Sequence, residues 1–141
     1  MGDSFQPTSS CKILIVDDDP AMRSLLLDEL WENGCSVIES PNGSDAISQV
    51  KSEVPSLIIT DLSMPGGGFD YLQALIASAE NCPIILITAF GNSQTKRQAE
   101  TCGVAAYFDK PVRVKDLKLA IQQVCPMVAS HTCPNTVFWK T

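Results

Sequence analysis

Short apolar runs that alternate with helical patterns along the whole chain constrain the fold more than any other feature. These runs predict strands at residues 12–16, 36–39, 56–60, 83–88 and 105–108. Three of them, KILIV, SLIIT and PIILIT, are apolar almost throughout rather than at every second position. Such runs are typical of strands that are covered on both faces, as in a parallel sheet between two layers of helices.

Helical patterns separate the predicted strands. The first helix is predicted to begin at Pro20, with Asp19 as its N-cap and Gly34 as its stop. The last predicted helix repeats apolar residues at helical spacing, namely Leu117, Ala120, Ile121 and Val124. Further helices are predicted at residues 44–51, 69–79 and 93–101. Five β-α units predict the α/β class, as a doubly wound (βα)5 sandwich with a five-stranded parallel sheet.

The length and composition fit one globular domain. The chain has 141 residues, of which 45% are hydrophobic and 18% charged, so it can bury a core of its own. We expect a tail at residues 1–10, the domain at 11–125, and an extension at 126–141 without an output domain. The VFWK sequence near the end is compatible with packing onto the domain or with binding a partner.

The charge balance and the termini exclude several classes of function. A net charge of −6 and a pI near 4.6 disfavour direct binding of nucleic acid, which requires Lys and Arg against phosphates. No apolar run approaches the roughly 20 residues of a membrane helix, and the first ten residues do not resemble a signal peptide. We therefore expect a cytoplasmic location and no membrane partner.

The six cysteines are scattered and form no CxxC pair. An even number of cysteines is typical of small secreted proteins with disulfides, but this chain can form a core without them. Reduced, structural thiols are therefore the expected state.

Polar residues stand at the carboxyl ends of four predicted strands. Asp17 and Asp18 follow the first strand, and Asp61 follows the third. Thr88 closes the fourth strand, and Lys110 lies just beyond the fifth. Open α/β sheets form their sites at these ends, so the residues are predicted to meet in one crevice.

The predicted crevice combines three carboxylates with one ammonium group. At about 4 Å, two carboxylates repel by about 1 kcal/mol in water and about 4 kcal/mol at an effective dielectric near 20. A hard divalent cation and Lys110 would relieve this repulsion, and Mg²⁺ prefers such oxygen ligands while keeping room for a phosphoryl oxygen. Each residue alone also fits an ordinary turn, cap or strand end; their ordered combination favours a phosphate-accepting metal site.

Four segments, ILIVDDD, LIITDLSMPGGG, ILITA and GVAAYFDKP, resemble the response-regulator receiver domain family of two-component signalling. The resemblance covers roughly Cys11 to Val124. It implies a CheY-like, flavodoxin-like sheet with strand order 2-1-3-4-5.

The resemblance also implies a role for each residue of the crevice. Asp61 would be the phosphoacceptor, and Lys110 would pair with the phosphoryl group. Asp17, Asp18 and Asp61, together with the backbone carbonyl of Ser63, would hold Mg²⁺, for which Mn²⁺ or Ca²⁺ is expected to substitute.

A conformational switch is implied as well. Thr88 would bond a phosphoryl oxygen, and the aromatic ring of Tyr107 would move inward when the threonine shifts. The resemblance implies a cis bond between Lys110 and Pro111. The output surface would be formed by the fourth helix, fifth strand and fifth helix.

The implied partners are a sensor histidine kinase or a phosphotransfer protein as donor, and a downstream protein of unknown identity. The implied chemistry is in-line attack by Asp61 on a phosphohistidine, giving an acyl phosphate that later hydrolyses. Such a chain is a signalling module that promotes only its own phosphorylation and dephosphorylation, rather than an enzyme.

Two other classes of protein share part of this pattern. A haloacid-dehalogenase phosphatase also uses a strand-end aspartate, but Ala21 stands where that family has Thr or Val, and a cap domain is missing. A flavodoxin-like cofactor binder would require a Ser, Thr or Gly loop after the first strand, where this chain has DDDP.

The loop after Asp61 departs from the commoner usage of the family. The triplet Gly66-Gly67-Gly68 predicts a flexible loop and leaves open where the third helix begins. Ser63 and Phe90 are expected at the mouth of the crevice, where they would tune the phosphoryl lifetime in a direction that the sequence does not give.

Overall fold

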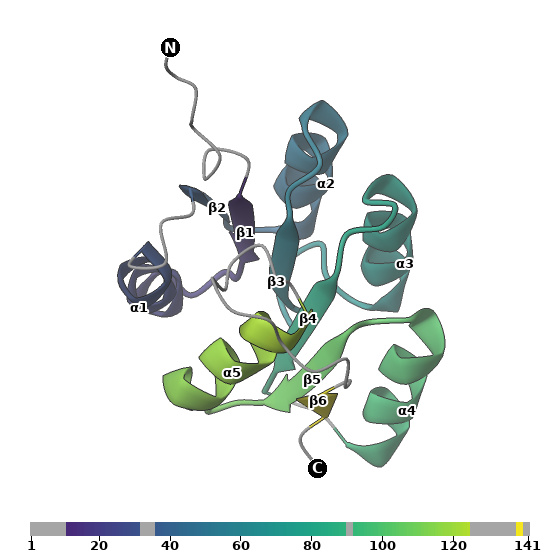
Figure 1. Ribbon diagram of the computed structural model, residues 1–141. Helices are drawn as coiled ribbons and strands as arrows, with labels where there is room; N and C mark the ends of the chain where they lie inside the picture. Colours follow the sequence, from purple (N-terminus) through teal and green to yellow (C-terminus); the bar gives the residue numbers. More distant parts are fainter. Residues whose placement is uncertain (1–10, 32–35, 90–91, 125–137, 140–141) are drawn as a thin grey trace.

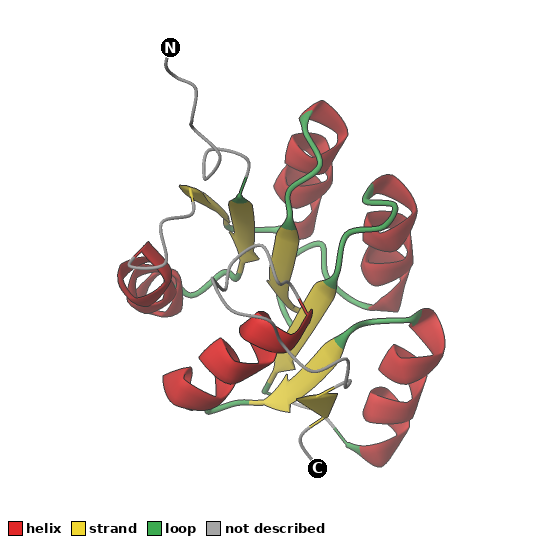
Figure 2. Cartoon of the chain, viewed as in Figure 1, coloured by secondary structure: helices red, strands yellow, loops and turns green. Residues whose placement is uncertain are grey.

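The computed structural model describes residues 11–31, 36–89, 92–124 and 138–139. Within them, strands and helices alternate along the chain (Figures 1 and 2). The strands are β1 (Lys12–Val16), β2 (Ser36–Ser40), β3 (Leu57–Asp61), β4 (Ile84–Thr88), β5 (Ala106–Asp109) and β6 (Phe138–Trp139). The helices are α1 (Pro20–Trp31), α2 (Gly43–Ser52), α3 (Phe69–Ser78), α4 (Ser93–Cys102) and α5 (Val114–Val124).

The described strands form one sheet in the order β2-β1-β3-β4-β5-β6, and every neighbouring pair is parallel. Its first five strands have the expected order 2-1-3-4-5, which confirms the doubly wound α/β fold. The register pairs Val16 with Thr60, and Asp61 with Ile87. The carboxyl ends of β1, β3 and β4 therefore lie side by side.

The sixth strand is an addition to the predicted sheet. Residues Phe138 and Trp139 pair with Ala106 and Tyr107, so β6 extends the sheet beyond β5. The sequence left the placement of this ending undecided because two residues carry no periodicity.

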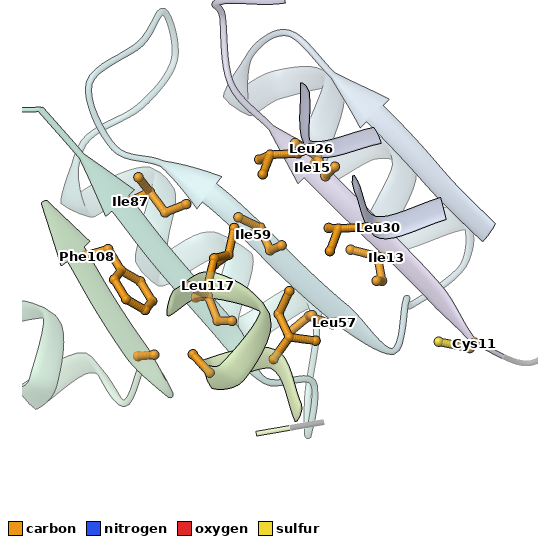
Figure 3. Close-up of a cluster of buried hydrophobic side chains, with 14 residues drawn as sticks. Cys11, Ile13, Ile15, Leu26, Leu30, Leu57, Ile59, Ile87, Phe108 and Leu117 are labelled. Atoms are coloured by element: carbon orange, nitrogen blue, oxygen red, sulfur yellow. The ribbon is translucent and has the colours of Figure 1, made fainter. Parts of the chain in front are cut away.

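The helices cover the sheet in two layers, with α1 and α5 on one face and α2, α3 and α4 on the other (Figure 1). Alternate residues of each strand point to opposite faces. Figure 3 shows the α1/α5 face, whose larger buried side chains are Ile13, Ile15, Leu26, Leu30, Leu57, Ile59, Ile85, Ile87, Phe108, Leu117 and Ile121. The α2/α3/α4 face buries Leu14, Val16, Val50, Ile58, Tyr71, Leu72, Leu75, Ile84, Leu86 and Tyr107.

Local sequence signals account for most element boundaries. Helix α1 begins at Pro20 as predicted, and the Asp19 side chain accepts a hydrogen bond from the Ala21 N–H at 3.0 Å. Strand β3 runs one residue further than predicted, so Asp61 is its last residue. Gly34, the predicted stop of α1, lies outside the described residues.

The expectation of reduced thiols is wrong for Cys11, which is disulfide-bonded. Disulfide partners are neighbours in space, and the scattered sequence positions gave no sign of one. Cys82 and Cys102 are free thiols, as expected. Among the described helices, none has the length and apolar character needed to cross a membrane.

Candidate functional site

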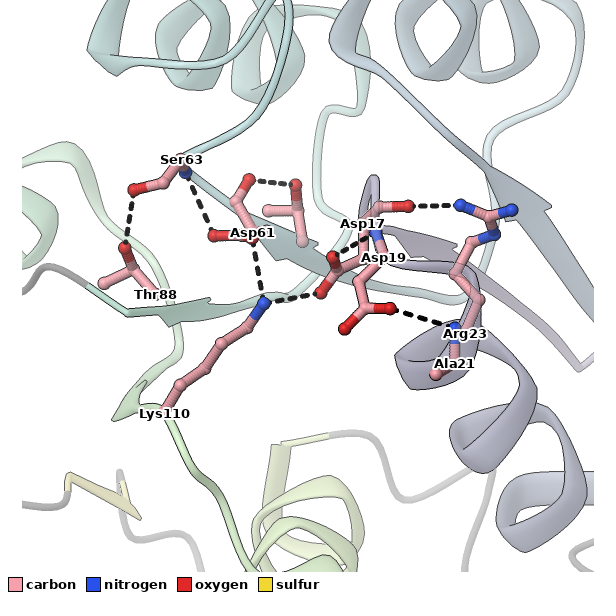
Figure 4. Close-up of polar contacts among 9 residues, drawn as sticks. Asp17, Asp19, Ala21, Arg23, Asp61, Ser63, Thr88 and Lys110 are labelled. Carbon is pink, nitrogen blue, oxygen red and sulfur yellow. Dashed lines mark hydrogen bonds and ion pairs between the residues drawn. The ribbon is translucent and has the colours of Figure 1, made fainter.

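Three carboxylates converge at the carboxyl ends of β1 and β3, as the sequence predicts. Figure 4 shows two of them, Asp17 and Asp61, connected through Lys110. Asp17 and Asp61 are buried, whereas Asp18 is exposed. One oxygen from each of the three lies within 4.8 Å of the others. We call Asp17, Asp18 and Asp61 the acid crevice.

Lys110 reaches into the acid crevice from the residue after β5. Its Nζ donates to Asp17 Oδ2 at 2.9 Å and to Asp61 Oδ2 at 3.0 Å. The Lys110 N–H also donates to the Thr88 carbonyl, and the bond to Pro111 is cis, as expected. One ammonium group thus bridges a carboxylate that follows β1 and a carboxylate at the end of β3.

The contacts within the acid crevice do not fully offset the cost of burying the Asp17 carboxylate. Burial raises the pKa of Asp17, although the Asp19 N–H and Lys110 oppose that rise. Burial would lower the pKa of Lys110, but its hydrogen bonds to Asp17 and Asp61 outweigh that effect and raise it. The raised Asp17 pKa means that further positive charge in the crevice would be stabilising.

Hydrogen bonds orient the Asp61 carboxylate on both of its oxygens. Oδ1 accepts the Ser63 N–H at 3.0 Å, and Oδ2 accepts Lys110. The Ser63 hydroxyl lies 3.2 Å from the Thr88 hydroxyl, which connects the loop after β3 to the end of β4 (Figure 4). Asp61, Ser63, Thr88 and Lys110 are therefore brought together as predicted.

Tyr107 lies outside the acid crevice, in the buried α2/α3/α4 face. Its side chain is 1% exposed within the α2/α3/α4 face, and its hydroxyl donates to Asp109 Oδ1 at 3.0 Å. Burial, with a contribution from Asp109, raises its pKa to about 12. Asp109 pairs with Thr88 across the sheet, so the tyrosine connects to the crevice through neighbouring strand ends. Phe90, predicted at the crevice mouth, lies outside the described residues.

The three consecutive glycines, Gly66-Gly67-Gly68, occupy positions that other residues would fit poorly. Gly66 and Gly68 have φ values of +73° and +95°, which L side chains rarely adopt. A Cβ on Gly67 would lie 2.2 Å from the Leu62 carbonyl oxygen. A Cβ on Gly43, at the start of α2, would lie 2.1 Å from the Gly66 carbonyl oxygen. The loop therefore requires glycine for its path, and α3 begins directly after it.

The sequence did not point to Arg23, whose side chain forms a hydrogen bond with the turn that carries Asp17. Its Nη1 donates to the Asp17 carbonyl at 2.6 Å, and its Nε donates to Glu39 Oε1 at 3.0 Å. The available signal was a basic residue one turn into the helix that follows the acidic turn. It also missed the buried contacts of Thr60 and Tyr71, which look like ordinary core positions in the sequence.

The donor set of the acid crevice fits a hard divalent cation. Three carboxylates from two strand ends offer only oxygen ligands, and one of them is exposed and accessible from solvent. Mg²⁺ and Ca²⁺ both prefer such ligands. The chemistry of the crevice therefore fits a divalent cation.

Comparisons of this chain with known proteins agree on one family. The model of the response regulator receiver domain matches residues 13–122. Sporulation initiation phosphotransferase F of Bacillus subtilis is 30% identical over 117 residues, covering 82% of this chain and 94% of that protein. An uncharacterized 14.6 kDa protein of Leptolyngbya boryana is 33% identical over 124 residues, covering 86% and 95%.

Solved structures show the same fold. A CheY-like receiver domain protein from Methanospirillum hungatei superposes with a TM-score of 0.79 at 23% identity, covering 85% of this chain and 97% of that one. A two-component response regulator from Clostridium difficile gives a TM-score of 0.78 at 25% identity, covering 85% and 99%. A response regulator from Burkholderia pseudomallei gives 0.74 at 24% identity, covering 84% and 70%.

Proposed function

This chain belongs to the response regulator receiver domain family of phosphoacceptor signalling modules, and we propose that Asp61 is the residue that accepts the phosphoryl group. One observation carries the proposal: Asp61 is buried at the end of β3, with each carboxylate oxygen held by a different donor. A nucleophile fixed in this way meets its target in a defined orientation.

The chemistry follows from that orientation. An Asp61 carboxylate oxygen attacks phosphorus in line, and the P–N bond of a donor phosphohistidine breaks, with its electron pair going to the imidazole nitrogen. The product is an acyl phosphate on Asp61. Lys110, which already bonds this carboxylate, offsets negative charge on the transferring group. Hydrolysis later releases inorganic phosphate and restores the carboxylate.

We assign the metal site to Asp17, Asp18 and Asp61, with the Ser63 backbone carbonyl as a further ligand, and Mg²⁺ as the ion. When bound, the ion supplies positive charge against the phosphoryl oxygens. The Burkholderia structure is described with a phosphorylated aspartic acid and a calcium ion, which supports a divalent site and the substitution of Ca²⁺. Mn²⁺, which also takes oxygen ligands, is expected to substitute as well.

Signal output is assigned to Thr88 and Tyr107. The phosphoryl group would draw the Thr88 hydroxyl away from Ser63, and the resulting rearrangement would reach Tyr107 and the α4-β5-α5 surface. The donor would be a sensor histidine kinase or a phosphotransfer protein, and the target a downstream protein. The domain at residues 11–125 would act in the cytoplasm, without binding nucleic acid or membrane itself.

The test is phosphorylation by acetyl phosphate in the presence of Mg²⁺, followed by intact mass measurement. The wild type is expected to gain one phosphoryl group, and Asp61→Asn none. Asp28→Asn, the same change at an exposed position of α1, is the matched control and is expected to gain one phosphoryl group. An unmodified wild type would overturn the proposal, and turnover of a phosphomonoester that depends on Asp17 would favour a phosphatase instead.

A further inference from the structure

A chain of buried hydroxyl groups lies directly beneath Asp61. The Tyr71 hydroxyl, from α3, is 2.8 Å from the Thr60 hydroxyl, which donates to the Asp61 backbone carbonyl at 2.9 Å. Tyr71 is 5% exposed and Thr60 0%, so neither hydroxyl is open to solvent. Both hydroxyl groups lie on the side of the sheet that the α2/α3/α4 face covers.

The number of available protons decides which hydroxyl group donates and which accepts. The Thr60 hydroxyl has one proton, and a carbonyl can only accept, so that proton is committed to Asp61. The Tyr71 hydroxyl must therefore donate to the Thr60 oxygen. The order is Tyr71 to Thr60 to Asp61, and the removal of the first donor weakens the second by loss of polarisation.

The ring of Tyr71 has a second role at the loop after Asp61. A Cβ on Gly43 would lie 2.8 Å from Tyr71 Cδ1, so the ring packs closely against the start of α2. At the same point the Gly43 N–H donates to the Pro65 carbonyl at 3.2 Å. Tyr71 thus contacts both the peptide of the acceptor and the helix end on which its loop rests.

The polar chain is not required for filling space. Phenylalanine has nearly the same shape as tyrosine and valine as threonine, and buried hydroxyls are costly unless they are bonded. A satisfied polar network fixes one arrangement of the groups that it joins. Here the fixed group is the peptide of the residue that carries the reacting carboxylate.

We propose that Tyr71 is a positioning residue for phosphoryl transfer, which acts through Thr60 to hold the peptide of Asp61 and, with its ring, the loop that follows. This inference rests on the proposed role of Asp61. Since small displacements of a reacting group lower the rate strongly, the network maintains the attack geometry without touching the phosphoryl group.

The experiment compares rates of phosphorylation by acetyl phosphate at saturating Mg²⁺. Tyr71→Phe and Thr60→Val are each expected to slow the reaction by about 10-fold, within the range that misplacement produces. Thr60→Ser retains the hydroxyl and is expected to restore the rate. Because the two groups act in series, the double variant should be no slower than Thr60→Val alone.

Ser40→Ala is the matched control for burial. The Ser40 hydroxyl is also buried at a strand end and donates to a backbone carbonyl, that of Asn42, but this bond lies outside the acid crevice. Its loss is expected to leave the phosphorylation rate unchanged.

A second measurement needs no phosphate. The hydrogen bond to the Asp61 carbonyl is lost in Thr60→Val and weakened in Tyr71→Phe, so the ¹⁵N chemical shift of the adjoining Leu62 amide should move in both variants, more in the first, and Thr60→Ser should return it. Wild-type rates and an unmoved Leu62 amide in folded Tyr71→Phe and Thr60→Val would overturn the inference. If the wild type itself gains no phosphoryl group, the role of Asp61 fails instead, and the amide shift still tests the network.

Discussion

The two faces of the sheet are built on the same strands but differ in chemistry. The described hydrophobic cluster on the α1/α5 face consists of aliphatic side chains, Phe108 and Cys11 (Figure 3). The α2/α3/α4 face contains Tyr71 and Tyr107, each with its hydroxyl in a hydrogen bond. The first cluster is therefore stabilised mainly by apolar packing, and the second combines packing with hydrogen bonds between its own side chains and polar partners.

This difference indicates which face can respond to events in the acid crevice. Two hydrogen bonds connect the Asp61 peptide to Tyr71 of α3. On the α1/α5 side, Arg23 of α1 donates to the Asp17 carbonyl at the end of β1, but the described buried side chains behind it meet by apolar packing. Packing contacts hold a structure with little directional preference, whereas polar contacts prefer one geometry. The predictions below test this contrast, from the largest expected effect to the smallest.

The largest effect is expected from Phe108→Ala on the α1/α5 face. Phe108 is 1% exposed, so its truncation should lower the free energy of unfolding by about 3–5 kcal/mol. Its neighbour Tyr107, on the opposite face, keeps its ring in Tyr107→Phe and loses the hydrogen bond to Asp109, which should cost about 0.5–1.5 kcal/mol. Urea unfolding measures both. Similar losses in the two variants would contradict the distinction between the faces.

The next largest effect is a loss of folding stability in alkaline solution, which arises from the α2/α3/α4 face. The chain has two tyrosines, and burial raises the pKa of each to about 12. Above pH 10 the unfolded chain releases these protons while the folded chain retains them, so stability falls as pH rises. For Tyr71 the loss should reach about 2–3 kcal/mol near pH 12.

Tyr71→Phe isolates this contribution. Lys110, whose pKa is also raised, loses its stabilising charge in the same pH range, but it is unchanged in the variant. The measurement is the free energy of unfolding from pH 9 to 11.5, where the variant should show a shallower decline than the wild type. Equal slopes would mean that the Tyr71 hydroxyl is less buried than the structure has it.

The sequence predicted the fold and most of the crevice because both leave one-dimensional signals. Continuous apolar runs such as PIILIT mark strands buried on both faces, and a carboxylate that ends such a run must lie at the sheet edge. Asp17, Asp61 and Lys110 can therefore be assigned to the crevice from the sequence alone.

The contacts that escaped prediction leave no such signal. Tyr71 fills an apolar position of α3, and Thr60 is a β-branched residue in a strand, so both look like core. Their hydrogen bond joins two elements across a loop whose path depends on three glycines. The close approach of Gly43 to this loop, the disulfide at Cys11 and the pairing of β6 likewise depend on tertiary packing.

A third prediction concerns Gly43, where the α2/α3/α4 face meets the loop after Asp61. Alanine is normally the better helix former by about 1 kcal/mol. Here its Cβ would clash with the Gly66 carbonyl and the Tyr71 ring, so Gly43→Ala should destabilise the protein by about 1–3 kcal/mol. Ser44→Ala, at the adjacent exposed position, should change stability by less than about 0.5 kcal/mol. A more stable Gly43→Ala in thermal unfolding would show that the loop can move aside.

The smallest effects are expected at the helix caps of the α2/α3/α4 layer. Asn42 and Asn92 each accept a backbone N–H at 2.8 Å, from Asp45 and Thr95 respectively. Alanine at either position should cost about 1 kcal/mol, and less at the exposed Asn92. Neither cap touches the acid crevice, so both variants should be phosphorylated by acetyl phosphate at the wild-type rate. If Asn92→Ala slowed the reaction while Asn42→Ala did not, the start of α4 would also hold the crevice in place, and α3 would not be its sole polar support on this face.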